Sequence, residues 1–177
     1  MIAGSMLCCK HKEKKIQGPI VSVISFLQAQ AKAIDSSSHP IFKIEKVDST
    51  SDTSIITKSE FHKYAQAFLA LPDISKEERK ENYEEAPDYD ELMNKVFMTY
   101  TATDADEEIR RQTVISEPNQ YGESDIKTIL INRLEAGKDS TVEQDMTWHT
   151  GRRFQIVTKT TKSGEAEKIK VLIVTWE

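Results

Sequence analysis

Residues 142–151, VEQDMTWHTG, contain the pattern that decides the fold. The apolar residues Val142, Met146 and Trp148 alternate with polar ones. This two-residue period is typical of a strand with one buried face and one solvent-exposed face. The stretch ends on a Thr-Gly pair, and a second strand-like run, residues 154–161, follows almost at once. So short a connection joins antiparallel neighbours. The stretch therefore predicts an antiparallel hairpin.

The same pattern continues on both sides of this hairpin. Between the later runs the connections contain the glycines and polar residues that tight turns require, which favours a meander over a parallel sheet. Strand-like runs occupy residues 41–47, 54–57, 95–101, 109–117, 126–134 and 168–176. The first two of these predict a further hairpin, joined by the polar residues 48–53.

Two segments have helical periodicity instead. Apolar residues at helical spacing between residues 20 and 34 predict an amphipathic helix. Thr57-Lys58-Ser59-Glu60 has the spacing of a capping box and predicts the start of a second helix, which Pro72 ends. Residues 75–85 are almost all polar or charged and predict a short solvated helix or a loop.

These elements predict the α+β class, with two amphipathic helices packed on a mostly antiparallel, curved β-meander sheet. A chain of 177 residues fits one domain. The predicted organisation is a truncated signal-like stub and polar tether at residues 1–18, followed by a single α+β domain at residues 19–177.

Charge and hydropathy restrict the classes of partner. The net charge of -5, from 24 Lys+Arg and 29 Asp+Glu, opposes the positive field on which non-specific nucleic-acid binding depends, so no nucleic-acid partner is expected. The longest apolar runs are far shorter than the roughly 20 residues of a membrane-spanning helix, so membrane contact is expected only through a lipid anchor. The oligomeric state does not follow from the sequence.

The only cysteines, Cys8 and Cys9, are adjacent and follow a short apolar stub. A polar run, residues 10–18, comes next and suits a solvated tether, so either cysteine is a candidate for lipid attachment. The alternative is a frayed cytosolic terminus with two exposed thiols. A metal site formed with His11 is disfavoured, because structural zinc sites need four ligands and a spacer between paired cysteines.

No motif predicts catalysis, a cofactor or a metal. Glycine-rich phosphate-binding runs are missing, and the four histidines are far apart in the sequence. Ser124 and Lys127 match a four-residue pattern that arises easily by chance, outside a predicted helix. Residues 104–108 are acidic but lack the glycine and distal glutamate of a calcium loop. Trp148 and Trp176 suit a packed core better than an aromatic binding platform.

An apolar helix entered through Gly18-Pro19 is followed along the chain by the segments Ile44-Glu45-Lys46-Val47, Ser51-Asp52-Thr53, Phe68-Leu69-Ala70-Leu71-Pro72-Asp73-Ile74, Val96-Phe97-Met98-Thr99-Tyr100 and Val174-Thr175-Trp176-Glu177. In the order of these segments the chain resembles a group of small uncharacterised bacterial envelope lipoproteins. The resemblance covers most of the chain from about Val21 onward. Similar proteins carry a lipid-bearing cysteine, which implies an envelope location on the periplasmic side for this chain, and the resemblance supplies no catalytic residue.

Two functional hypotheses follow. The first is a non-enzymatic envelope lipoprotein, tethered through Cys8 or Cys9, whose sheet face or exposed helix flank binds another envelope component. The second is a small α+β ligand-binding protein or enzyme with a pocket between the helices and the sheet.

Overall fold

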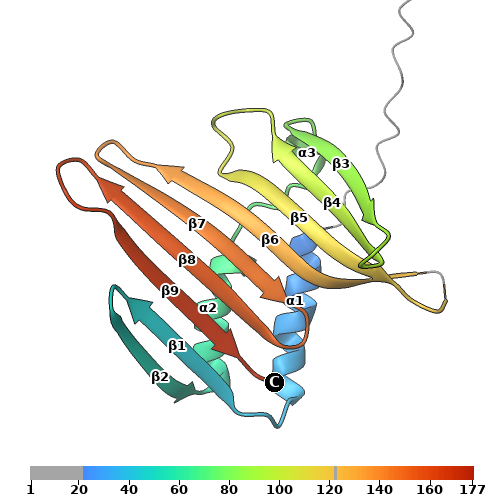
Figure 1. Cartoon of the computed structure of the whole chain (residues 1–177), viewed down its shortest axis with the longest axis horizontal. Coiled ribbons are helices and arrows are strands. Elements are labelled where there is room, and N and C mark those ends of the chain that lie inside the picture. Colours follow the sequence, from blue (N-terminus) through green and yellow to red (C-terminus); the bar gives the residue numbers. More distant parts are fainter. Residues whose placement is uncertain (1–21, 122) are drawn as a thin grey trace, which may run out of the picture.

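A computed structural model describes residues 22–121 and 123–177 of the chain. Its main feature is one open sheet of nine strands, in the order β2-β1-β9-β8-β7-β6-β5-β4-β3, in which every neighbouring pair is antiparallel (Figure 1). The strands are β1 (Ile41–Val47), β2 (Thr50–Ile56), β3 (Tyr83–Asp90), β4 (Lys95–Ala102), β5 (Ile109–Pro118), β6 (Ser124–Ala136), β7 (Ser140–His149), β8 (Arg153–Lys162) and β9 (Lys168–Thr175). The predicted antiparallel pairing is confirmed.

The helices are short. Helix α1 (Val23–Ala33) begins at Ser22, whose side chain accepts a hydrogen bond from the Ser25 backbone N–H, and continues into the 3-10 turn Ile34–Ser36. Helix α2 (Lys58–Leu69) begins at the predicted capping box, in which Thr57 and Glu60 each accept a backbone hydrogen bond from the other. A single turn, α3 (Glu77–Lys80), lies between α2 and β3.

The predicted α+β class, with two helices packed on the sheet, is wrong. Strands make up 52% of the structure and helices 19%, and the helices within residues 22–121 and 123–177 are three short ones beside a nine-stranded open sheet. The error has a physical cause. Thirteen residues of β6 and ten residues in each of three other strands take up much of the chain, and β3 is a strand although half of its residues are acidic and it contains Pro87.

The two faces of the sheet differ in what covers them. Trp148 lies opposite Ile129 on β6 and Phe154 on β8, so these side chains share one face. The rings of Phe61 and Phe68 on α2 contact Trp148 edge-on at centroid distances of 6.4 and 5.2 Å. Trp148 and Trp176 are both buried, as predicted for core residues. In Figure 1, α1 and α2 lie behind the sheet on this side.

We call the opposite side of the sheet the open face. The strand register defines one continuous row of its residues, because cross-strand partners point to the same side. From β2 to β3 this row runs Thr53, Ile44, Ile173, Gln155, Thr147, Leu130, Thr113, Thr99 and Ala86. Threonines and aliphatic residues dominate this row, so the open face is neither fully polar nor fully apolar.

Candidate functional site

The open face is hollowed over five neighbouring strands, β3 to β7. The groove has a volume of about 1090 Å³, slightly above the range of about 300–1,000 Å³ usual for small-molecule pockets. It is lined by Ala86, Pro87, Asp88, Phe97, Thr99, Thr101, Arg111, Thr113, Leu130, Ile131, Asn132, Asp145, Met146 and Thr147. Five strands spaced about 4.8 Å apart give a groove roughly 19 Å across the strands.

The floor of the groove combines hydroxyl groups with apolar side chains. The Thr99 and Thr113 hydroxyls lie 3.1 Å apart across β4 and β5 and share a hydrogen bond. Thr113 is only 6% exposed although it lies on the open face, so neighbouring side chains cover most of it. Phe97 lies on β4 and the half-exposed Leu130 on β6. A threonine hydroxyl both donates and accepts, so this floor can bind donors and acceptors alike.

Charged groups lie along one row of the groove. Arg111 on β5 is opposite Thr101 on β4 and Asn132 on β6. The Asn132 side-chain amide donates to Glu143 Oε1 at 3.2 Å and to Asp145 Oδ1 at 2.9 Å. Within the described residues, the Arg111 guanidinium has no hydrogen-bond or ion-pair partner. Its five donors are therefore free to bind an acceptor placed in the groove.

A smaller hollow adjoins this surface at the β7–β8 hairpin. It has a volume of about 210 Å³ and is lined by His149, Arg152, Arg153 and Glu177. Arg152 Nε donates to Glu177 Oε2 at 2.6 Å, and His149 Nδ1 lies 3.1 Å from Thr128 Oγ1. Burial, and then the positive charges of Arg153 and Arg152, lower the pKa of His149 below its ordinary value. The Glu177 carboxylate offsets part of the positive charge here.

No family model, curated protein or solved structure matches this chain.

Cys8, Cys9 and His11 lie outside the described residues. Among residues 22–121 and 123–177, no helix is long and apolar enough to cross a membrane. In the same part of the chain, no group of three or more His, Cys, Asp or Glu side chains is arranged to hold a metal ion.

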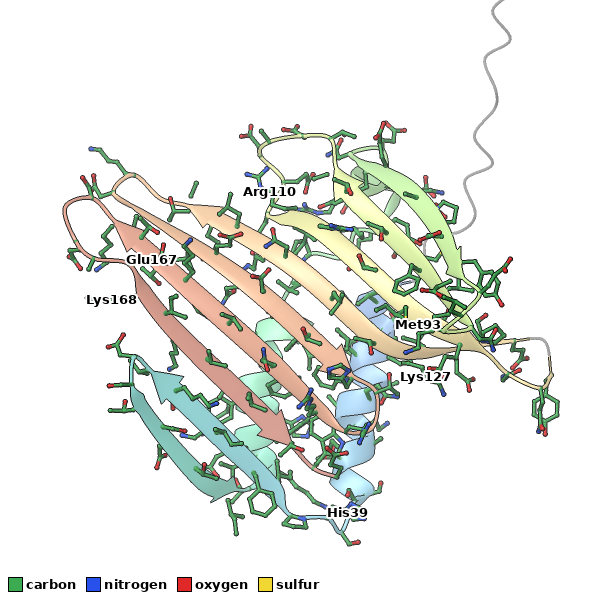
Figure 2. The ribbon with its side chains drawn as sticks, viewed as in Figure 1. His39, Met93, Arg110, Lys127, Glu167 and Lys168 are labelled. Atoms are coloured by element: carbon green, nitrogen blue, oxygen red, sulfur yellow. The ribbon has the colours of Figure 1, made fainter. Side chains whose placement is uncertain are left out.

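The weaker sequence candidates are scattered or structural. His62 Nε2 lies 2.7 Å from Asp35 Oδ1 between α2 and the end of the first helical segment, far along the chain from His149. Lys127 forms an ion pair with Asp125, at 3.4 Å, and no hydrogen bond joins it to Ser124 within the described residues. Figure 2 labels Lys127 near the start of β6, an inner strand of the sheet.

The acidic residues 104–108 include a buried carboxylate. Glu107, 9% exposed, accepts from Arg79 Nη1 at 2.8 Å, from Asn82 Nδ2 at 2.7 Å and from the Tyr83 hydroxyl at 3.3 Å. Burial, and then the Glu107 charge, raise the pKa of Tyr83 above its ordinary value. Both oxygens of this carboxylate are used within the fold, so Glu107 holds the start of β3 against that of β5 and is not a cation ligand.

The space between the helices and the sheet is largely filled. Its centre contains the rings of Phe61, Phe68, Trp148, Phe154 and Trp176, all between 0% and 4% exposed. A notch of about 260 Å³ opens beside α2, lined partly by Tyr64, Gln144 and Leu172. The groove on the open face is about four times as large, so the geometry favours the open face as the binding surface.

Sequence reasoning missed the groove residues. Thr99, Thr113 and Leu130 belong to different strands, and each one alone looks like an ordinary strand residue. The available signal was the alternation of apolar or aromatic residues with threonine in Met98-Thr99-Tyr100-Thr101, whereas residues 109–117 contain a single threonine, Thr113. That alternation places residues on a face, but only the register shows which of them lie side by side.

Proposed function

We propose that this protein is a non-enzymatic binding module that binds an extended polypeptide segment of a partner protein in the groove of the open face. The observation that carries the proposal is a groove of about 1090 Å³ on the face opposite α1 and α2, with the Arg111 guanidinium unpartnered among the described residues.

The chemistry of the lining favours a polypeptide. A peptide backbone presents alternating donors and acceptors, and the threonine hydroxyls of the groove can satisfy both. Phe97 and Leu130 offer apolar surface for side chains between those polar contacts. At about 3.3 Å per residue, a groove roughly 19 Å wide accommodates about six residues of an extended chain. A carboxylate on that chain would complete a bidentate pair with Arg111.

The location belongs to the same proposal. The sequence supports an envelope protein attached through Cys8 or Cys9, with the polar residues 10–18 as the tether. Cell fractionation and the mass of the mature protein test it. Cys8→Ser and Cys9→Ser, made separately, identify the acceptor, since only the correct one abolishes lipid modification. A protein found wholly in the soluble cytosolic fraction, with an unmodified terminus, would contradict the location and leave the groove proposal open.

Site-specific photo-crosslinking tests the groove. A photoreactive phenylalanine analogue is placed at Leu130 or Thr101 in the groove and, as a control, at exposed Lys63 on α2. We expect one discrete protein adduct in cells from the groove positions and none from Lys63. Arg111→Glu should abolish that adduct, whereas Arg152→Glu, outside the groove, should not. Equal adducts from both faces, or an adduct that survives Arg111→Glu, would contradict the proposal.

A further inference from the structure

The two outer strands of the sheet differ in how they are protected. β3 contains Pro87, which has no backbone N–H to donate, and it carries the acidic residues Glu84, Glu85, Asp88 and Asp90. Proline and clustered like charges are devices that prevent a sheet edge from pairing with another chain. The β3 edge is therefore protected against pairing with a strand of another chain.

The other outer strand, β2, has none of these devices. All seven residues of β2 pair with β1 without a register shift. Its sequence, TSDTSII, has no proline, no lysine or arginine, and one charge, on Asp52. Threonine and isoleucine favour strands. Ile55 is 71% exposed and lies opposite Phe42 on β1, so apolar surface borders this edge. A regular edge strand without proline or clustered charges is a template for strand pairing.

We propose that β2 is a homodimer interface, in which two copies of this chain pair their β2 strands antiparallel about a two-fold axis at Thr53. The occupant of the edge is thus a second copy, and the two sheets become one continuous sheet. Charge favours self-pairing here, because this register places Asp52 opposite Ser54 of the second copy and opposes no like charges. The same pairing through β3 would bring its carboxylates together.

The hairpin turn decides which residues of β2 bond outward. Val47 and Thr50 close the two-residue turn Asp48-Ser49, and such a closing pair exchanges both of its backbone hydrogen bonds. Hydrogen bonding alternates along an antiparallel strand, so Thr53 directs its N–H and C=O away from β1. Pairing about Thr53 therefore joins the free backbone groups of both copies.

Cysteine crosslinking tests the register. The background is the full chain with Cys8→Ser and Cys9→Ser. Thr53→Cys should be bridged by a short bis-thiol reagent, since directly paired Cα atoms lie about 5.5 Å apart. Ser51→Cys and Ile55→Cys should each fail alone, because like residues then lie roughly 14 Å apart, but an equimolar mixture of the two should be bridged. Ala86→Cys, exposed on β3, is the matched control and should stay unbridged.

Sedimentation equilibrium tests the association itself. The unmodified chain should show a concentration-dependent dimer. Thr53→Pro removes an outward N–H that β1 does not use, so the hairpin should survive while dimer affinity falls roughly tenfold or more, the equivalent of about 1.4 kcal/mol. Thr53→Val keeps the N–H and should still dimerise, and circular dichroism checks that each variant is folded. A monomeric unmodified chain, an unimpaired Thr53→Pro dimer, or bridging at Ala86→Cys would each overturn the proposal.

Discussion

The indole of Trp148 on β7 stacks on the ring of Phe154 on β8, with centroids 5.1 Å apart and 21° between the ring planes. Both side chains are fully buried, and Phe61 and Phe68 of α2 contact them. This aromatic cluster joins α2 to the centre of the sheet. Rings of this size dominate core energetics because each removes a large apolar area from water.

Truncation of Trp148 should destabilise the fold strongly. We expect Trp148→Ala to lower the free energy of unfolding by about 3–5 kcal/mol, measured by urea denaturation. Trp148→Phe should cost much less, because it keeps a ring in place and removes an indole N–H that is buried without a partner among the described residues. Tyr121→Ala, at a side chain 80% exposed, is the control. Equal losses for Trp148→Phe and Trp148→Ala would contradict this account.

The buried carboxylate of Glu107 should stabilise the β3 end of the sheet. Glu107→Ala leaves Arg79 and Asn82 without their acceptor, and we expect a loss of about 1–3 kcal/mol in the free energy of unfolding. The pKa of Tyr83 should fall in the same variant, since the neighbouring negative charge is gone, and the ultraviolet absorbance of the phenolate measures it. The matched control is Glu78→Ala, an exposed glutamate of α3. An unchanged Tyr83 titration would contradict this role for Glu107.

Part of the fold follows from the sequence by local rules. Period-two alternation and short glycine-containing links predict β7, β8 and their hairpin, and a capping box predicts the start of α2. The class prediction failed because local rules do not weigh one element against another. β3 shows why. Its Pro87 and four acidic residues argue against a strand. An outer strand, however, hydrogen-bonds to a neighbour on one side only, so it tolerates a residue without a backbone N–H and need not be buried on both faces.

The groove is harder to predict than the strands that form it. Thr99, Thr113 and Leu130 come together because three strands pair in one register, and a shift of one residue would move each of them to the other face. β5 also has register shifts near Ile109 and Ile115, which the sequence does not signal. In Figure 2, Arg110 marks the first of these irregularities, at the start of β5.

The β1–β2 turn should tolerate glycine and reject a branched residue. Asp48 has a φ of 52°, in the left-handed region that aspartate tolerates and β-branched residues avoid. We expect Asp48→Val to lower the free energy of unfolding by about 1–2 kcal/mol, whereas Asp48→Gly should leave it unchanged or raise it. Ser49→Val, at the other turn residue, is the control. Thermal unfolding followed by circular dichroism measures the series, and an Asp48→Val variant as stable as Asp48→Gly would contradict it.

The lowered pKa of His149 should make stability fall on acidification. Burial, and then Arg153 and Arg152, disfavour the charged imidazole in the folded chain. Below the ordinary value of 6.5 the unfolded chain therefore takes up this proton before the folded chain does, so stability decreases as the pH falls from there toward the folded-state pKa.

Arg153→Gln removes one of the two positive charges and should raise the pKa of His149 toward 6.5, which shortens the pH range over which stability is lost. Lys138→Gln, in the turn at the other end of β7, is the charge-matched control and should change neither quantity. Two-dimensional NMR of the imidazole ring reports the pKa directly, and urea denaturation at several pH values reports the stability. Since burial is the larger cause, the pKa should remain below 6.5 even in Arg153→Gln. A pKa of His149 above 6.5 in the unmodified protein would contradict this prediction, because burial and the two arginines would then not determine the pKa.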